Sequence, residues 1–363
     1  TDVFRSAGKT SNAFTDQVVL PPDSIRTTQG SFYTVFTPYK KRWIAAVLER
    51  GAAGLLPVPA KQKVLSVEPD SVPVALDGFN GLRRPDLWIS GEDEAQSRLQ
   101  VFSDRAIQTY QEARDVPGCN GTSRISPYLA IGVLSPRQCL QAALAVNQQC
   151  LDGGSEGVVT WISELIWREF YRHVLVGYPW VCMDQAFDSR TKTIPWRDQA
   201  GEFESWCEGQ TGIPIVDAGM RQLARTGWMH NRVRMITAMF LTKNLFMDWR
   251  RGETHFMRNL VDGDFASNNG GWQWSASVGT DAVPYFRVFN PLRQSERFDP
   301  NGAYIRKFVP ELAELSDKAI HLPHDRAPEQ AAQAGYPQAL VDLKASRQRA
   351  IAMFKEHRAG SVG

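Results

Sequence analysis

The least ordinary stretch of this 363-residue chain runs from Asp262 to Trp274 and reads DGDFASNNGGWQW. Its two carboxylates suit metal ligands, general acid–base groups, or acceptors for ribose hydroxyls and ring N–H groups. Zinc is disfavoured because no His or Cys lies nearby. A glycosidase pair is possible by composition, but one residue between the carboxylates does not control their separation. A turn capped by Asp and Asn side chains is the structural alternative, and the residues alone leave the choice open.

A second polar segment, Gly121–Pro127, reads GTSRISP and brings three hydroxyls and one guanidinium together. Hydroxyls, a guanidinium and free N–H groups at the start of a helix suit a phosphate or pyrophosphate. The simpler interpretation makes Ser126 an N-cap, followed by Pro127 at the first helical position. Both interpretations remain open at this point.

Stacking and hydrogen-bonding side chains also occur in separate parts of the chain. An indole can cover the face of an extruded nucleobase while a carboxylate or amide hydrogen-bonds its edge. Residues 221–258 contain eight basic residues against two acidic ones, which suits an anion or nucleic-acid surface as well as a solvated helix face. The candidate base-binding residues are Glu164, Trp167, Tyr171, Asn231, Met235 and Trp274.

Two helices must position most of these side chains. Residues 161–175 carry apolar residues at 162, 165, 166, 170 and 174, the period of an amphipathic helix. Glu164, Trp167, Arg168 and Tyr171 then fall along an adjoining face at three- and four-residue spacing. A second helix is expected over 228–249, where Asn231, Arg234 and Met235 share a face.

Composition narrows the class of protein. With 43% hydrophobic and 22% charged residues, the chain is neither disordered nor collagen-like. No apolar run approaches the ~18 residues of a membrane span, and the N-terminus lacks the apolar core of a signal peptide. Five cysteines without CxxC spacing make a disulfide scaffold or zinc site improbable and favour a reducing cytoplasm. The net charge of +2 by itself predicts no partner.

Along the chain, a strand-like run at 17–20 and a short helix near 38–49 precede a proline-rich stretch between Pro57 and Pro85. The prolines deny regular structure there and indicate an interdomain connection. From Glu92 onward the pattern is helical. We find no βαβ alternation, GxGxxG motif or P-loop, so the body of the chain is predicted to be all-helical.

Several ordered motifs together resemble the photolyase/cryptochrome family, and most closely its bacterial class I cyclobutane pyrimidine dimer photolyases. The resemblance runs from about Val18 to the C-terminal region. Its motifs are Gly121–Ser126, Glu164–Tyr171, Thr211–Asp217, Gly227–Met235, Asp262–Trp274 and Pro284–Pro291. Base-flipping enzymes include photolyases, which agrees with the nucleobase interpretation.

The resemblance implies a mainly α fold. Residues 91–358 would form the helical FAD-binding catalytic domain, residues 21–90 an irregular interdomain linker, and residues 1–20 the end of a truncated α/β antenna domain. Because most of that antenna domain would be missing, the resemblance gives little reason to expect a folate or deazaflavin antenna pigment in this chain.

By position, the resemblance also implies a FAD site in which Asp262 pairs with Arg234 beside the isoalloxazine ring and Asn268 faces flavin N5. This favours the phosphate interpretation of the hydroxyl-rich loop. The implied FAD contacts are Tyr110, Thr122, Ser123, Arg124, Ile125, Ser126, Arg234, Asp262, Gly263, Asp264 and Asn268.

For DNA, the resemblance implies that Trp167 and Trp274 flank the dimer, Met235 closes its side, and Glu164 and Asn231 hydrogen-bond its bases. Arg168 and Tyr171 belong to the same surface, and Arg114, Arg232 and Gln294 would hold the DNA backbone. Trp272, Trp249 and Trp196 match a relay that photoreduces oxidised flavin. Asn268 and Glu164 complete the implied catalytic set.

The expected function is light-driven electron transfer from reduced FAD that splits cyclobutane pyrimidine dimers in UV-damaged DNA. A cryptochrome-type blue-light receptor is the alternative; Asn268 disfavours it, because plant-type receptors usually carry Asp and animal ones Cys at this position. A (6-4) photolyase is disfavoured because its substrate pocket uses histidines, although His230 lies on the pocket-facing segment. We expect a monomer in the cytoplasm, without a metal or membrane association.

Overall fold

The computed structural model describes residues 2–12, 14–50, 60, 66–68, 70–71, 73 and 84–360. Within these residues the chain is mainly helical, and its sole β feature is an isolated bridge between Arg197 and Met247. The expected mainly α fold is therefore confirmed.

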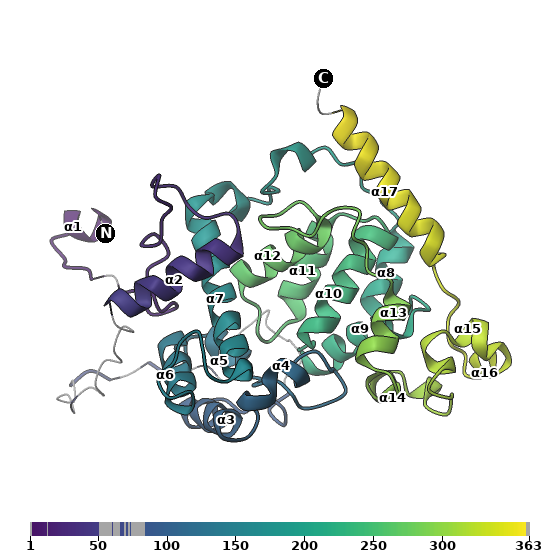
Figure 1. The fold of residues 1–363 in the computed structure, drawn as a ribbon, viewed down its shortest axis with the longest axis horizontal. Coiled ribbons are helices and arrows are strands. Elements are labelled where there is room, and N and C mark those ends of the chain that lie inside the picture. The colour runs from purple at the N-terminus through teal and green to yellow at the C-terminus, as the bar shows by residue number, and fades with distance from the viewer. Residues whose placement is uncertain are drawn as a thin grey trace.

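The first half of the chain forms a group of helices around α7, the longest of them (Figure 1). Ser135 begins α6 with a capping box, in which its hydroxyl accepts from the Gln138 N–H while the Gln138 side chain accepts from the Ser135 N–H. The helices of this half are α1 (Asp2–Ser6), α2 (Phe36–Arg50), α3 (Glu92–Arg105), α4 (Tyr110–Ala113), α5 (Ser126–Ala130), α6 (Pro136–Val146) and α7 (Glu156–Gly177), with the short 3₁₀ segments η1 (Ile107–Thr109) and η2 (Pro179–Cys182).

In the second half of the chain, residues that favour turns end some of the helices. Gly227, for example, ends α9 in the left-handed conformation at φ 68°. Its elements are η3 (Ser189–Thr191), α8 (Ala200–Glu208), α9 (Pro214–Thr226), α10 (Asn231–Met239), the π-helix η4 (Phe240–Asn244), α11 (Trp249–Asn259), α12 (Phe265–Ala276), α13 (Pro291–Phe298), α14 (Ala303–Phe308), η5 (Pro310–Leu312), η6 (Ala319–His321), α15 (Pro323–Arg326), α16 (Pro328–Gln333) and α17 (Leu343–Gly360).

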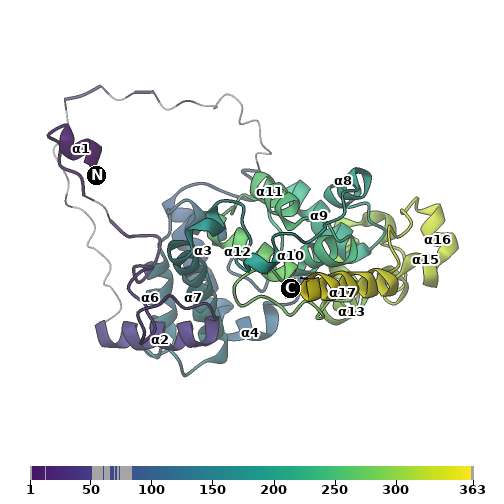
Figure 2. The same ribbon diagram turned by 90° about the horizontal axis from the view of Figure 1, so that it is seen from above.

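The helices pack around two hydrophobic cores. One packs α2, α3, α5, α6 and α7 together, and the other packs α8 to α12 with α14 and α17. The two groups of helices lie side by side when the molecule is seen from above, with α7 close to α12 at their boundary (Figure 2). A seam therefore runs between the cores, and α7 and α12 form its two walls.

The segment before α3 packs tightly on α7. Glu169, buried on α7, accepts hydrogen bonds from the Val19 N–H, the Leu20 N–H at 3.3 Å and the Trp43 indole N–H at 2.7 Å. One turn later, His173 donates to the Pro22 carbonyl at 2.7 Å through Nδ1 and accepts from the Tyr33 N–H at 2.9 Å through Nε2. These contacts bind residues 19–43 to the helical body.

Two expectations for this segment change in consequence. Residues 17–20 form no strand; the N–H groups of Val19 and Leu20 bond to a helix side chain instead of a neighbouring strand. The helix expected near 38–49 is present as α2. Although it lies within residues 21–90, the expected linker, its buried residues are part of the first core. Most of the stretch from Pro57 to Pro85 lies outside the described residues, and the domain boundaries stay a prediction.

The helix expected over 161–175 is confirmed as α7, whereas the helix expected over 228–249 is interrupted. His230 caps the start of α10, which passes into the π-helix η4, and Asp248 then caps a separate helix, α11. The periodicity of apolar residues continues through both helices, so it could not show the break at residues 245–248.

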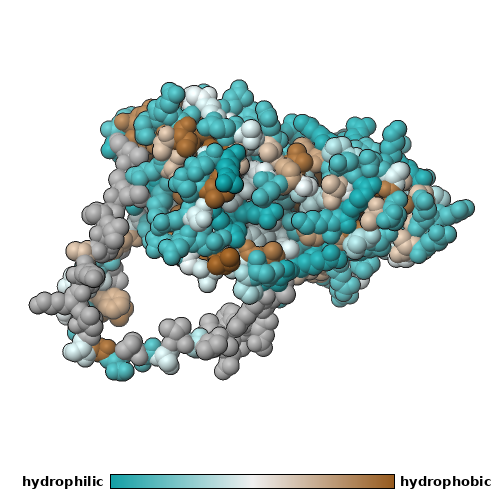
Figure 3. Space-filling view, turned by 90° about the horizontal axis from the view of Figure 1, so that it is seen from below, coloured by the Kyte–Doolittle hydropathy of each residue, from teal (hydrophilic) through white to brown (hydrophobic). Residues whose placement is uncertain are grey.

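The face of the molecule seen from below is largely hydrophilic, with apolar residues in small, separate groups (Figure 3). Among the described residues, no helix combines the length and the apolar character needed to cross a bilayer.

Glu169 makes the stability of the fold depend on pH. Burial raises the pKa of this carboxyl to about 7, even though three N–H donors favour its anion. Between its ordinary pKa and about 7, the folded protein binds a proton that the unfolded chain releases, so this group lowers stability as pH rises. By linkage, the loss is about 3 kcal/mol.

We therefore expect the difference in unfolding free energy between the wild type and Glu169→Gln to shift by up to about 3 kcal/mol in favour of the variant between pH 4.5 and 8. Urea denaturation at several pH values measures it. A difference that does not change with pH would show that Glu169 ionises normally in the fold.

Candidate functional site

Three adjoining cavities lie along the seam between the two cores. Their volumes are about 150, 280 and 360 Å³, and Asn231 and Ser267 line all three. Arg234, Asp262 and Asp264 line both the 150 and the 280 Å³ cavities. The seam therefore holds one connected hollow of the size that cofactor and substrate sites have.

The hydroxyl-rich loop forms one wall of the 280 Å³ cavity. Residues 122–126 line it, together with Tyr110. Arg124 adopts a positive φ of 51°, and its buried Nε has no hydrogen-bond partner among the described residues. Burial lowers the pKa of Arg124, because no carboxylate compensates its charge. A partly buried guanidinium with an unpaired Nε, beside hydroxyls, is suited to an anionic ligand group.

The alternative of an N-cap at Ser126 is wrong in detail. The N-cap position belongs to Ile125, and Ser126 already lies inside the first turn of α5. The loop therefore presents its polar groups to the cavity instead of using them to start the helix.

Both carboxylates of the Asp262–Trp274 stretch are held by arginines. Asp262 accepts from Arg234 Nη2 at 2.8 and 3.0 Å, as the resemblance implied, and Asp264 accepts from Arg172 Nη2 at 2.6 Å. Asp264 also caps α12 by accepting from the Ser267 N–H at 3.0 Å. Burial would raise the pKa of Asp264, but Arg172 and Ser267 outweigh it, and the net shift is downward.

Carboxylates already engaged by arginines are poorly placed for general acid catalysis or for a metal. In the part of the chain that the structure describes, no group of three His, Cys, Asp or Glu side chains could hold a metal ion. The capped-turn interpretation is right for Asp264, which caps α12; because Asp264 also lines the cavity, the ligand interpretation stays a prediction.

The residues of the Asn-Asn-Gly-Gly run, 268–271, lie on two sides of α12 and have different contacts on each side. Asn268 and Gly271 face the 150 Å³ cavity, with Ser267, Trp272 and Ser275 at the matching helical spacing. On the other side, Asn269 donates to the buried Glu253 carboxylate at 2.9 Å. A Cβ at Gly270 would overlap the Tyr171 ring, so this glycine lets α12 approach α7 closely.

Asn268 is oriented by its neighbour on α11. Its Nδ2 donates to the Glu253 main-chain carbonyl at 3.0 Å. The Oδ1 atom of the same amide makes no hydrogen bond within the described residues and can accept one from a donor in the cavity.

The 360 Å³ cavity collects the predicted base-binding residues. Glu164, Trp167, Arg168 and Tyr171 of α7 face Asn231 and Met235 of α10, and Arg114, Ser267, Gly271 and Trp274 complete the lining. Phe36 of α2 stacks on Trp167 with ring centroids 3.6 Å apart and planes 7° apart. The Trp167 ring is thus held from behind by an aromatic residue that the sequence analysis placed in a linker.

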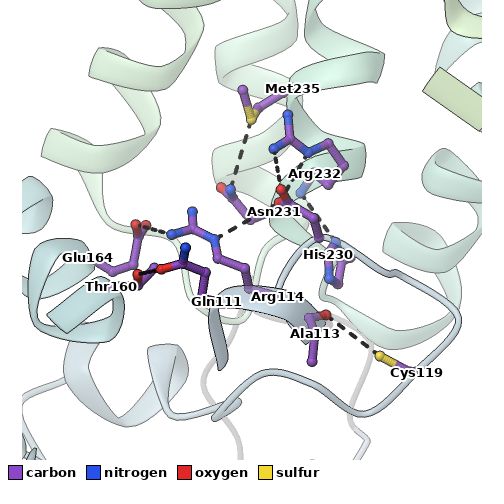
Figure 4. A network of polar contacts seen from close by, with 11 residues as sticks. Gln111, Ala113, Arg114, Cys119, Thr160, Glu164, His230, Asn231, Arg232 and Met235 are labelled. Carbon is purple, nitrogen blue, oxygen red and sulfur yellow. Dashed lines mark hydrogen bonds and ion pairs between the residues drawn. The ribbon is translucent and has the colours of Figure 1, made fainter. Parts of the chain in front are cut away.

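A salt bridge joins two of the residues that line this cavity. Arg114 donates to Glu164 Oε1 at 2.6 Å, and Figure 4 shows this pair beside Asn231 and Met235. Burial raises the pKa of Glu164, although Arg114 opposes the shift. Asn231 Nδ2 lies 3.9 Å from the Met235 sulfur.

Some predicted site residues lie elsewhere. Gly263 is not among the residues lining the three cavities, and Arg232 lies beside them, with its guanidinium over the Phe298 ring. Gln294 lines a separate groove of about 470 Å³ together with Arg293 and Arg347. A DNA contact at Gln294 would therefore lie outside the aromatic cavity.

The three relay candidates extend away from the cavities into the second core. Trp272 lines the 150 Å³ cavity, Trp249 is buried, and Trp196 packs on Phe246 and Phe354 with centroids 5.0 and 6.0 Å apart. Trp206, which was not predicted, lies 6.0 Å from Trp272 in an edge-on contact.

His230 does not enter the cavities. It is buried and accepts from the Arg232 N–H at 3.2 Å as the N-cap of α10. Burial lowers the pKa of His230 to about 4, which keeps the ring neutral at physiological pH.

Sequence reasoning missed several residues that line the cavities or contact the residues that line them. Arg172 follows Arg168 by four residues on α7, and that spacing could have revealed it. Ser267 follows Asp264 by three residues, the spacing of a helix cap. Phe36, Trp228 and Asp115 gave no comparable signal, because only the tertiary fold brings them to the site.

We expect Asp262→Asn to destabilise the protein by about 3 kcal/mol, because it leaves Arg234 without its buried counter-ion. Asp198→Asn is a matched control, since Asp198 pairs with Arg251 at 2.8 Å on the surface and should contribute less than about 1 kcal/mol. Chemical denaturation compares the two. Equal effects would mean that the Asp262 pair behaves as a surface ion pair.

Comparison with known proteins identifies the family. The family described as the FAD binding domain of DNA photolyase matches residues 161–356. The chain is 44% identical to the deoxyribodipyrimidine photo-lyase of Escherichia coli over 351 residues, which are 96% of this chain and 73% of that protein. It is 45% identical to the same enzyme of Vibrio cholerae, covering 95% of this chain and 72% of that one.

Solved structures agree. A class III photolyase from Agrobacterium tumefaciens superimposes with a TM-score of 0.89 at 37% identity, covering 99% of this chain and 75% of that one. A cryptochrome from Synechocystis gives a TM-score of 0.77 at 30% identity, with 97% and 74% coverage. The expected resemblance, helical fold, FAD cofactor and DNA-lyase function are confirmed. The chain belongs to the DNA photolyase family.

Proposed function

We propose that this chain repairs cyclobutane pyrimidine dimers with the residue roles set out below, and one observation carries the proposal. The aromatic 360 Å³ cavity and the cavities lined by the Arg124 loop and Asn268 share Asn231 and Ser267. A flipped dimer in the first would lie against a cofactor in the others.

The cavity residues fit FAD. Arg124, with its unpaired buried Nε, suits the pyrophosphate, and Thr122 and Ser123 add hydroxyl donors. Asp262, fixed by Arg234, supplies acceptors for ring N–H groups, while the Asn268 Oδ1 suits a donor such as N5–H. When bound and reduced, FAD supplies under blue light the electron that opens the two carbon–carbon bonds of the dimer and receives it back, so the reaction involves no net oxidation.

The protein groups bind and orient the dimer. Trp167, held by Phe36, and Trp274 offer apolar faces to the two bases, and Met235 closes the side. Asn231 can both donate to and accept from the base edges. Glu164 accepts when ionised, and its raised pKa also makes donation possible in the protonated form.

We further propose that Trp272, Trp249 and Trp196 pass electrons from the surface to the cofactor. Trp272 at the cavity wall and Trp196 at the edge of the second core support the two ends of this path. The protein would act as a monomer in the cytoplasm, where five free cysteines are compatible with a reducing compartment.

A blue-light receptor is the second candidate, and the similarity to the Synechocystis cryptochrome favours it. A (6-4) photolyase finds less support, because His230 is neutral and buried away from the aromatic cavity.

Repair of a thymine-dimer oligonucleotide by the purified protein with reduced FAD, in blue light and in darkness, tests the proposal. We expect light-dependent restoration of two thymines. Bound FAD without repair would favour the receptor, and repair of (6-4) lesions alone would favour the related enzyme.

We expect Trp167→Ala to weaken binding of dimer-containing DNA about tenfold or more, because base–aromatic stacking contributes ~1–3 kcal/mol. Flavin absorbance should be retained. Trp167→Phe keeps a ring on Phe36 and should retain most of the affinity. Unchanged binding by the alanine variant would remove Trp167 from the substrate pocket.

We expect Trp249→Phe to block photoreduction of oxidised FAD while sparing repair after chemical reduction, because phenylalanine is much harder to oxidise. Trp206→Phe is the matched control, since Trp206 contacts Trp272 but is not on the proposed path. Transient absorption and repair assays separate the two activities. Loss of photoreduction in the Trp206 variant alone would redirect the relay.

A further inference from the structure

Asp115 contacts both Arg114 and Arg232, the two arginines expected to bind the DNA backbone. Asp115 accepts from Arg232 Nε at 3.2 Å and from Arg232 Nη2 at 2.7 Å, and it lies 4.0 Å from Arg114 Nε. Arg114 in turn pairs with Glu164 of the cavity. Figure 4 shows Arg114 between Glu164 and Arg232.

We propose that Asp115 is a specificity-determining positioning residue, which limits binding to undamaged DNA and holds Arg114 and Arg232 in register for damaged DNA. The inference rests on the proposed function, because it concerns the same DNA surface.

The network is formally neutral. Two arginines face two carboxylates, and all four side chains are partly buried, with 18–33% of their surface exposed. Charges in such positions are screened less by salt than charges in open solvent. A phosphate that approaches this rim meets arginines already compensated by Asp115 and Glu164, so non-specific attraction is weak.

Binding to undamaged DNA depends almost entirely on such phosphate contacts. Dimer-containing DNA has a second source of affinity, because its flipped bases enter the cavity beside Trp167 and Trp274. A carboxylate that reduces backbone attraction therefore penalises undamaged DNA more, which is a common way to build specificity.

Asp115 also fixes geometry. Its two oxygens engage Nε and Nη2 of Arg232, which sets the guanidinium plane and leaves Nη1 as a donor toward a phosphate. Through Arg114 the same carboxylate supports the position of Glu164. Loss of this orientation lowers the affinity for dimer-containing DNA only, because only that complex has flipped bases for Glu164 to contact.

Asp115→Asn tests the proposal in the full chain with bound FAD. Binding to matched duplexes, with and without one thymine dimer, is measured over a range of salt concentrations. We expect the affinity for undamaged DNA to rise about three- to tenfold at low salt. The slope of log K against log salt should steepen by about 0.9, the value for one added phosphate contact. The preference for damaged DNA should fall correspondingly.

Two variants serve as controls. Asp198→Asn makes the same charge change at the surface pair with Arg251 and should leave the preference unaltered. Asp115→Glu keeps the carboxylate and should restore the wild-type salt slope, which a general packing defect would not do. Arg232→Gln should act in the opposite direction and lower the slope for both duplexes.

The outcomes separate the two proposals. A wild-type protein without preference for the dimer would overturn the proposed function. A wild type with that preference, but an Asp115→Asn variant indistinguishable from Asp198→Asn, or one that binds both duplexes more weakly, would overturn the role of Asp115.

Discussion

The close approach of α12 to α7 organises this molecule. Gly270 lacks the side chain that would collide with the Tyr171 ring, and the two helices therefore form opposite walls of one seam. Both ends of α12 are fixed by side-chain hydrogen bonds. Asp264 caps its N-terminus, and the buried Lys243 Nζ donates to the Ala276 carbonyl at 3.1 Å and to the Ser277 hydroxyl at 2.8 Å. Positioned in this way, α12 turns Asn268 and Gly271 toward the cavities and leaves Asn269 for the buried contact with Glu253.

The walls of the hollow carry many ionised groups but little uncompensated charge. Arg234, Arg172, Arg232 and Arg114 each pair with a carboxylate. Arg124 and Arg168 also line the 280 Å³ cavity, and neither forms an ion pair with a carboxylate among the described residues. Arg168 donates to Gln17 and to the Leu129 carbonyl, whereas the Arg124 Nε has no hydrogen-bond partner there, so Arg124 is the guanidinium more available to a ligand anion. Under the proposed roles, this surface would hold an anionic cofactor at Arg124 while its paired arginines limit the attraction for undamaged DNA.

The sequence predicted elements with a strong local signal. The apolar period from 161 to 175 gave α7, and its adjoining face proved to be the cavity face. Pairing of Asp262 with Arg234 came from family resemblance, because the two residues are 28 positions apart and no local pattern links them. The break between η4 and α11 escaped notice because apolar spacing continues across it. Docking of residues 19–43 on α7 also escaped notice, since it depends on two polar side chains, Glu169 and His173, that read as ordinary helix residues.

The shared lining of the three cavities is the feature of the fold that would allow electron transfer between a cofactor and a substrate. Electron exchange between a cofactor and a substrate requires that little material separate them, yet each must be bound by its own groups. Here Asn231 and Ser267 line all three cavities, which hold the proposed cofactor and substrate sites, and Gly271 lines both the 150 and the 360 Å³ cavities. A Cβ built on Gly271 would meet no neighbouring atom within 4 Å, which shows that the space beside this residue is open. Because α7 and α12 are rigidly packed on either side, that space is fixed by the fold before any ligand binds.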